Sequence, residues 1–491
     1  MSYVYRFIYL LITVFVLGQY TFVFAQQVEF EPEKSVVKIR VSNQSYNAKN
    51  PWKKNDFRKK SGYGCVLNKQ TILTTADVVA NHVFIEVEKA GSSTKVPANL
   101  LAVDYDANLA VLSVNDKEFF QNLQPVEFME KLPLKGPAEA IIFEHSNEVR
   151  SVPGKISRVS VVRYKYGWNK FPGMEITINF QGKGGGWGEP VFVSGKLLGI
   201  TWFYGKNQVA GIIPYTVIEH FLIDLEDGEY NGFVHPGFKF WKLEDSALRS
   251  YLSMPSDKTG IYITRIIPGG SADAILKRGD VLLSLEGVLI DNDGYYLDKD
   301  FGRQPFLLLL TDKSPGDKME AEILREGQVK KVVLVLKRFM SGEGLIPMIT
   351  IDKQPDYCIE GGLIIQELTL DYLKSWGKDW QKRANTEFLF YYINEREFPK
   401  PDKKKLVILN RVLPDKANLG YQDLSNKIIV EVNDRPIASL EDVPEAMKHP
   451  VNGLHSFRFK NGVLLVLKDS DLQETNNRIK KKYFINKLSN I

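Results

Sequence analysis

One sequence pattern occurs twice in the C-terminal half of the chain and limits the folds that this half can adopt. In its first copy, residues 260–272 contain an aliphatic run followed by a turn and small residues. Residues 276–287 then contain a Gly-Asp turn and a second aliphatic run. Its second copy lies at 407–417 and 428–437. Glycine and aspartate favour tight turns, and alternating aliphatic residues bury one face of a strand. The pattern therefore predicts two related β-rich domains in tandem.

The chain has 491 residues, which is too long for one hydrophobic core and predicts about three domains. The formal net charge is +5 and both signs are interspersed, so no nucleic-acid-binding surface is predicted. The two cysteines, Cys65 and Cys358, fall in different predicted domains, so a disulfide is not required. No zinc-type spacing and no phosphate-binding glycine loop occurs, and we predict no metal and no cofactor.

The N-terminus has the pattern of an export signal. A short basic start ending at Arg6 precedes an apolar stretch from Phe7 to Phe24, and Ala25 provides a small residue at the expected cleavage position. Residues 1–25 are therefore predicted to be a signal peptide, and the mature protein is predicted to be periplasmic or extracellular. The stretch is long for a signal peptide, so an uncleaved anchor remains an alternative.

From about residue 27 to 227 the chain has short apolar runs broken by Gly, Asn and Pro, which predicts an all-β double barrel. Three segments in this region resemble the catalytic segments of trypsin-like serine proteases of the HtrA/Deg family. They are Ile-Leu-Thr-Thr-Ala-Asp-Val-Val at 72–79, Asn-Leu-Ala-Val-Leu at 108–112 and Gly-Gly-Gly-Trp-Gly-Glu-Pro at 184–190. The resemblance assigns Asp77, Asn108 and Trp187 to the positions of the family's histidine, aspartate and serine.

These substitutions predict that the triad is degenerate. A serine needs a base and an orienting carboxylate to become a nucleophile, and an indole has no lone pair with which to attack a carbonyl. The stretch from Gln181 to Val193 contains no Ser, Thr or Cys that could take over. His82 is expected to lie on an exposed helix face away from Asp77. Trp187 is expected either to fill the substrate cleft or to leave it open, with Glu189 adding negative charge beside it.

The resemblance extends to nearly the whole mature chain and implies a mainly β fold, with a trypsin-like double β-barrel followed by two PDZ domains. The expected domains are the protease-like domain at 27–227, a first PDZ domain (PDZ1) at 231–340 and a divergent second one (PDZ2) at 345–470. A helical insertion is expected at 374–384 within PDZ2, and a basic tail at 471–491.

A PDZ domain binds the end of a peptide chain at a sheet edge, where backbone amides hold the terminal carboxylate. In PDZ1 the segment Gly237-Phe238-Lys239-Phe240 resembles the family's carboxylate-binding loop. Lys239 replaces a glycine there, and it either adds a charge for the carboxylate or blocks the loop. In PDZ2 the corresponding residues are Gly362, Leu363, Ile364 and Ile365.

Three classes of function remain open. The favoured one is a non-catalytic protein of the cell envelope that binds peptides or unfolded proteins through its PDZ domains. The second is a regulatory subunit of an active Deg paralogue, and the third is an active serine endopeptidase with an unusual site. The family resemblance also implies a homo-oligomer, in the simplest case a trimer.

Overall fold

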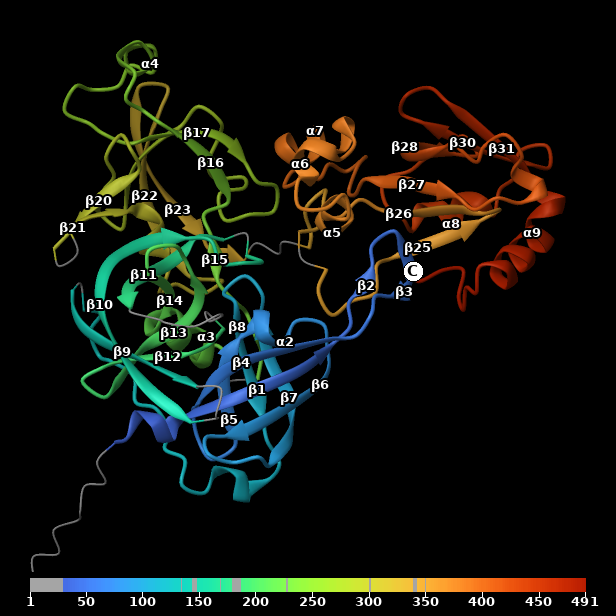
Figure 1. Ribbon diagram of the computed structural model, residues 1–491. Helices are drawn as coiled ribbons and strands as arrows, with labels where there is room; N and C mark the ends of the chain where they lie inside the picture. Colours follow the sequence, from blue (N-terminus) through green and yellow to red (C-terminus); the bar gives the residue numbers. More distant parts are fainter. Residues whose placement is uncertain are drawn as a thin grey trace, which may run out of the picture.

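The computed structural model describes residues 30–491 except for positions 134, 144–147, 168, 179–186, 227, 300–301, 339–341 and 349. Two β-barrels lie side by side, PDZ1 lies above them in Figure 1, and PDZ2 lies to their right. The expected signal peptide lies outside the described residues. Within them, every helix is too short or too polar to cross a membrane.

The N-terminal half forms two closed barrels, as the sequence predicts. The first has the strand order β1-β4-β5-β8-β7-β6 and the second β10-β11-β14-β13-β12-β9. The strands are β1 (Val36–Asn43), β4 (Arg58–Val66), β5 (Thr71–Thr75), β6 (His82–Lys89), β7 (Lys95–Asp104), β8 (Leu109–Ser113), β9 (Gly136–Phe143), β10 (Val149–Val162), β11 (Phe171–Ile178), β12 (Pro190–Val193), β13 (Lys196–Tyr204) and β14 (Val209–Pro214).

Short helices accompany the barrels: η1 (Pro32–Ser35), α2 (Ala76–Val79), η2 (Lys117–Phe120) and α3 (Tyr215–Ile223). Each barrel has its own apolar interior, and a third cluster joins the two barrels to α3. In that shared cluster Phe192, Ile200 and Phe221 are fully buried. The shared core fixes the two barrels against each other and so fixes the groove between them.

PDZ1 is built on a sheet in which β16 is an edge strand. The strand order is β16-β17-β18-β22-β23, with β19 paired to β18. The elements are β15 (Val234–His235), β16 (Phe238–Lys242), α4 (Ser246–Tyr251), β17 (Ile261–Ile266), β18 (Val281–Leu285), β19 (Val288–Leu289), β20 (Tyr295–Asp298), β21 (Gly302–Pro305), η3 (Phe306–Leu310), β22 (Lys318–Arg325), β23 (Gln328–Val335) and β24 (Lys337–Arg338).

PDZ2 repeats this plan with one more strand outside. Its sheet has the order β25-β26-β27-β28-β30-β31, with β29 paired to β28. The elements are β25 (Tyr357–Glu360), β26 (Leu363–Glu367), α5 (Leu370–Lys374), α6 (Trp380–Arg383), α7 (Thr386–Asn394), β27 (Val407–Val412), η4 (Lys416–Asn418), β28 (Ser425–Val432), β29 (Arg435–Pro436), α8 (Asp442–Met447), β30 (Leu454–Phe459), β31 (Leu464–Lys468) and α9 (Asp469–Lys482). The expected helical insertion is therefore larger than predicted and comprises α5, α6 and α7.

The segment expected to be a basic tail is part of PDZ2. It begins within helix α9, which buries Ile479. Beyond the helix the chain runs antiparallel to β25, where Ile359 N donates to Leu488 O at 2.8 Å and Asn490 N donates to Tyr357 O at 2.9 Å. The lysines at 480–482 gave the segment its tail-like composition, but the interleaved apolar residues decide its packing.

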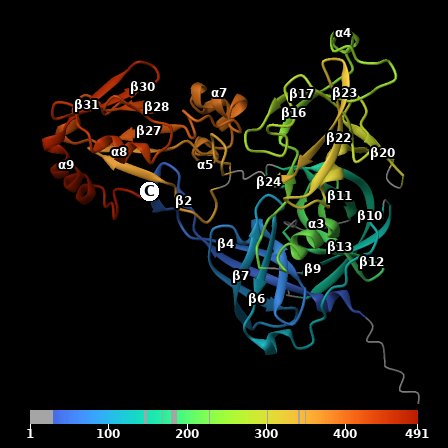
Figure 2. The same ribbon diagram turned by 180° about the vertical axis from the view of Figure 1, so that it is seen from behind.

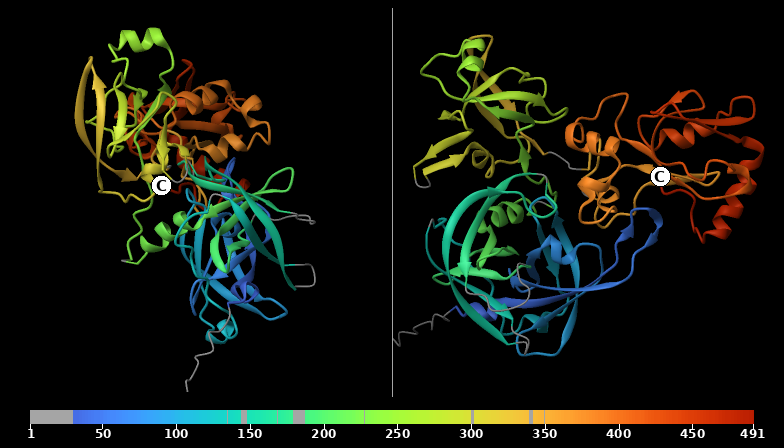
Figure 3. Two further views of the ribbon diagram at one scale, coloured as in Figure 1. Left: turned by 90° about the vertical axis from the view of Figure 1, so that its left-hand side faces the viewer. Right: turned by 45° about the horizontal axis from the view of Figure 1, so that its top comes forward.

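A hairpin of the first barrel holds PDZ2 in place. It consists of β2 (Tyr46–Asn47) and β3 (Asn50–Lys54) and reaches from the barrel to PDZ2 (Figures 1 and 2, and the right-hand view of Figure 3). Asn410 Nδ2 donates to Lys49 O at 2.8 Å, and Gln354 Nε2 donates to Pro51 O at 3.0 Å. Because side-chain amides bind backbone carbonyls here, the contact specifies the orientation of PDZ2 as well as its attachment.

Candidate functional site

The three positions expected to carry the triad lie at the junction of the two barrels. Asp77 is on α2 directly after β5, Asn108 precedes β8, and Trp187 lies three residues before β12. Tyr63 N of β4 donates to Trp187 O at 2.8 Å, and this ties the third segment to the first barrel. The earlier part of the glycine-rich segment, up to residue 186, lies outside the described residues.

The Asp77 carboxylate is saturated with donors. Lys60 Nζ lies 2.7 Å from Oδ2, Lys165 Nζ lies 2.6 Å from Oδ1, and the Tyr166 hydroxyl donates to Oδ1 at 2.7 Å. Only 3% of the Asp77 side chain is exposed. Burial raises the pKa of Asp77, but the two lysines outweigh burial and leave the pKa below its usual value. A weakly basic, fully bonded carboxylate is a poor general base.

Asn108 contacts the start of α2 through both its side chain and its backbone. Its Oδ1 accepts from Asp77 N at 2.9 Å, and its carbonyl accepts from Ala76 N at 3.0 Å. The backbone of Asn108 is left-handed, with φ +56°, a conformation that asparagine tolerates better than most residues. The Nδ2 atom is buried and has no hydrogen-bond partner within the described part of the chain. Asn108 thus positions α2 but gives no orienting charge to position 77.

The backbone amide of Trp187 is already occupied. Trp187 N donates to Glu189 Oε2 at 2.9 Å, and the Glu189 side chain is 1% exposed. Thr201 Oγ1 donates to the same carboxylate oxygen and accepts from Glu189 N at 3.1 Å. In a trypsin-like protease the amide of the nucleophile residue helps to form the oxyanion hole. Here a carboxylate of the protein itself binds that amide.

The Trp187 indole does not fill a closed cavity, because the residue is 36% exposed. Lys60 Nζ lies 5.7 Å from its ring centroid, so the indole and Asp77 share one lysine. The buried side chain in this segment is that of Glu189. Burial, and after it the charge of Glu189, raises the pKa of Tyr63 to about 12. His82 is not on a helix as expected: it opens β6, and α2 ends at Val79.

Sequence analysis missed the partners of Asp77. Lys165 and Tyr166 follow β10 in the second barrel, 88 and 89 residues away in sequence. Lys60 belongs to the basic segment 58–60, where it is not distinguishable from exposed neighbours. These side chains meet only because the two barrels pack against each other, and the spacing of residues in the sequence does not predict that contact.

The expected carboxylate-binding segment of PDZ1 lies at the entrance of a groove. Gly237 has φ +79°, and a Cβ there would lie 2.6 Å from Ser271 N, so the turn requires glycine. Phe238, Lys239 and Phe240 then form the start of the edge strand β16. The rings of Phe238 and Phe240 lie 6.2 and 5.3 Å from that of Phe306 in η3, and together they make an apolar floor.

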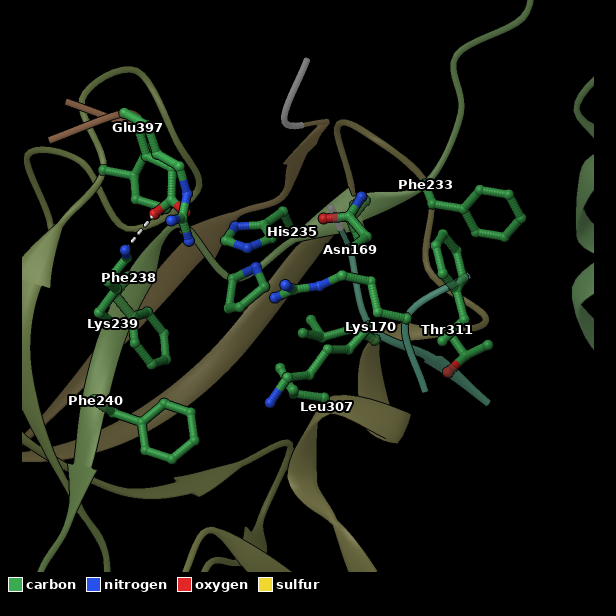
Figure 4. A pocket seen from close by; sticks show the side chains of 17 residues that line it. Asn169, Lys170, Phe233, His235, Phe238, Lys239, Phe240, Leu307, Thr311 and Glu397 are labelled. Carbon is green, nitrogen blue, oxygen red and sulfur yellow. Dashed lines mark ion pairs between the residues drawn. The ribbon is translucent and has the colours of Figure 1, made fainter. Parts of the chain in front are cut away.

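A pocket of about 310 Å³ lies at this end of the groove (Figure 4). Its lining combines β16 and η3 of PDZ1 with residues of the second barrel and of PDZ2. Lys239 points away from the apolar floor, and its Nζ lies 2.7 Å from Glu397 Oε2 of PDZ2. Lys239 therefore leaves the pocket open and contributes charge to its rim.

The corresponding segment of PDZ2 is not a groove. Gly362 precedes β26, and Leu363, Ile364 and Ile365 within that strand are fully buried. Strand β26 is internal, since β25 pairs with one side of it and β27 with the other. A peptide cannot be added to a strand whose two edges are both paired. The expectation of a second peptide-binding loop therefore differs from the structure, because sequence alone did not reveal the extra outer strand.

His235 gives the pocket a testable pH dependence. Gly237 N donates to His235 Nδ1 at 2.9 Å, and burial, Lys239 and Arg163 lower the pKa of His235 from 6.5 to about 4. The unfolded chain then binds a proton at higher pH than the folded chain, so stability falls as the pH decreases from 6.5 to 4. We expect a loss of about 3 kcal/mol, measured as thermal unfolding of PDZ1 in the full chain against pH, and a smaller loss in His235→Asn. Equal pH profiles would contradict this assignment.

Comparison with known proteins agrees with this architecture. A trypsin-like peptidase domain model matches residues 62–200, and two PDZ domain models match residues 246–293 and 346–489. The putative protease Do-like 13 of Arabidopsis thaliana is 28% identical over 419 residues, covering 84% of this chain and 80% of that protein. The mitochondrial protease Do-like 4 of the same plant is 28% identical over 420 residues, covering 84% and 76%.

Among solved structures, the HtrA-type protease AlgW with tripeptide is 19% identical, with a TM-score of 0.48, over 62% of this chain and 94% of that one. The serine endoprotease from Yersinia pestis is 18% identical, with a TM-score of 0.42, over 62% and 95%. Domain models and relatives together define a trypsin-like peptidase fold followed by two PDZ domains. The chain is similar to Do-like proteases along 84% of its length, and the predicted fold class, a trypsin-like double barrel followed by PDZ domains, is confirmed.

Proposed function

We propose that this protein is a catalytically inactive member of the HtrA/Deg family that binds the carboxyl-terminal segments of partner proteins through PDZ1. The proposed inactivity rests on the contacts of Asp77, which stands where the family has its general base. Lys60, Lys165 and Tyr166 bind its carboxylate. Residue 187 offers no nucleophile, and its amide is bound to Glu189. Base, nucleophile and oxyanion donor are thus each replaced or occupied.

The second half rests on the groove of PDZ1. Strand β16 has a free edge in the sheet order, and the apolar floor formed by Phe238, Phe240 and Phe306 lies beside it. An extended peptide added to this edge gains backbone hydrogen bonds, and its last side chain gains an apolar contact. PDZ2, in this proposal, serves to position the other domains.

The proposal places the protein in the cell envelope, which follows from the signal-like N-terminus, and in a homo-oligomer of at least three copies. Several PDZ1 grooves in one assembly would raise the effective concentration for a partner with several chain ends. Both points rest on sequence and family, and sedimentation of the purified mature chain measures the second directly.

Fluorescence anisotropy with a library of carboxyl-terminal peptides tests the binding half. We expect peptides with an apolar last residue to bind as free acids and to bind at least roughly tenfold more weakly as amides. Leu307→Asp, which puts a charge into the groove wall, should weaken binding by a similar factor. Leu289→Asp is the matched control, because Leu289 is exposed and does not line this pocket. Equal binding of acids and amides would overturn the proposal.

A further inference from the structure

The pocket at the end of the PDZ1 groove has more positive charge than its own domain supplies. Arg163 and Lys170 come from the second barrel, where they flank the segment between β10 and β11, and Arg396 comes from PDZ2. With Lys239 they make four cations around one carboxylate, Glu397. His235 is neutral above pH 5 because its pKa is lowered to about 4.

These cations are close enough to affect one another. Burial and then Arg396 lower the pKa of Arg163, and burial and then Arg163 lower the pKa of Lys170. Glu397 is 3% exposed, and its carboxylate lies 2.7 Å from Lys239 Nζ and 3.4 Å from Arg396 Nε, so one carboxylate pairs with two of the four cations. An additional carboxylate in the pocket would reduce the repulsion among the others.

The pocket also has a polar atom ready for a ligand. Asn169 is 5% exposed and lines the pocket, and its Oδ1 atom has no hydrogen-bond partner among the residues that the structure describes. Figure 4 shows Asn169 and Lys170 facing Lys239 and Glu397 across the pocket, with His235 between them. A buried carbonyl oxygen without a donor is costly, and a backbone N–H of a bound peptide that donates to it would recover that cost.

From these contacts we infer that the pocket takes a carboxyl-terminal segment with an apolar last residue and an acidic side chain just before it, and that the ligand's carboxylate replaces Glu397 beside Lys239. This inference rests on the proposed function and specifies its ligand. The apolar side chain would contact Phe238 and Phe240. The acidic side chain would lie against Arg163 and Lys170, so a bound ligand would touch both PDZ1 and the second barrel.

The position of Glu397 is fixed by a contact between the two PDZ domains. Arg265 Nη1 of β17 donates to Asn394 O at 2.5 Å, and its guanidinium lies 3.4 Å from the ring centroid of Phe398. Glu397 lies between Asn394 and Phe398 in sequence, and its side chain reaches Lys239 from this segment. Binding of a ligand carboxylate therefore competes with one ion pair of the interdomain contact.

Fluorescence anisotropy on the full chain separates the inference from the proposed function. Three peptides share an apolar last residue and carry Glu, Gln or Lys before it, each as free acid and as amide. We expect the Glu free acid to bind roughly tenfold more tightly than the Gln peptide, and the Lys peptide to bind most weakly. Arg163→Gln and Lys170→Gln should each reduce the ratio between the affinities of the Glu and Gln peptides.

Glu397→Gln should tighten the binding of every free acid by roughly tenfold, since it removes the internal competitor. Glu395→Gln is the matched control, because Glu395 lies two residues away, does not line the pocket and should leave binding unchanged. Equal affinities across the Glu, Gln and Lys peptides, or no response to Glu397→Gln, would overturn the inference while leaving PDZ1 as a peptide-binding domain. Failure of all free acids to bind would instead overturn the proposed function.

Discussion

Asp77→Asn should lower the free energy of unfolding of the barrel pair by about 3 kcal/mol, although it changes a single atom. The reason is Lys60, whose side chain is only 20% exposed and whose ammonium group pairs with the Asp77 carboxylate. Removing one partner of a buried ion pair leaves the other charge without compensation. Lys165 is 49% exposed and can turn towards water. Calorimetry should show the barrel transition roughly 6–12 °C lower.

Two further variants make this prediction specific. Adding Lys60→Met to Asp77→Asn removes the unpaired charge and should restore most of the lost stability, which a double-mutant cycle measures directly. Glu130→Gln is the control for the substitution itself: Glu130 is 88% exposed in its pair with Lys196, and the expected change is below about 1 kcal/mol. If Asp77→Asn lowered the free energy of unfolding as little as Glu130→Gln, the ion pairs of Asp77 would not stabilise the barrels as described.

Restoring the family's triad residues alone should not restore proteolysis. A variant with Asp77→His, Asn108→Asp and Trp187→Ser still has Glu189, whose carboxylate binds the amide of residue 187. A substrate carbonyl would have to displace it, and the developing oxyanion would lie beside a negative charge. Loss of one oxyanion-hole donor typically costs about 10²–10³ in turnover. We therefore expect near-background cleavage of casein.

Adding Glu189→Gly to that variant should raise casein turnover by at least about 100-fold. Both variants should carry Lys60→Gln, so that neither retains an unpaired buried ammonium group. Folding is checked by comparing their circular dichroism spectra with that of the wild type. Equal turnover by the two folded variants would show that Glu189 does not block the site.

The sequence predicts the fold well because the barrels and both PDZ domains have local patterns. Alternating strands, Gly-Asp turns and the tandem repeat are all readable within a few residues. The segments around Asp77, Asn108 and Trp187 were located in the same way, and the structure brings them together at the barrel junction.

The chemistry of these positions depended on contacts that local patterns do not contain. Lys165 and Tyr166 reach Asp77 from the other barrel, and Glu397 reaches PDZ1 from PDZ2. Gly362–Ile365 has the pattern of a binding loop, but the outer strand β25 encloses the neighbouring β26. Whether a strand is at an edge depends on the whole sheet, so its sequence does not report it.

Turnover of unfolded casein by the purified wild-type chain tests the central claim most directly. The proposed inactivity, argued from the ion pairs of Asp77 and from the contact between the Trp187 amide and Glu189, predicts fragment release equal to a protein-free blank. Trypsin at the same concentration provides the positive control. Fragment release above the blank that co-purifies with the chain, and that is abolished by a serine-directed phosphonate, would contradict the account.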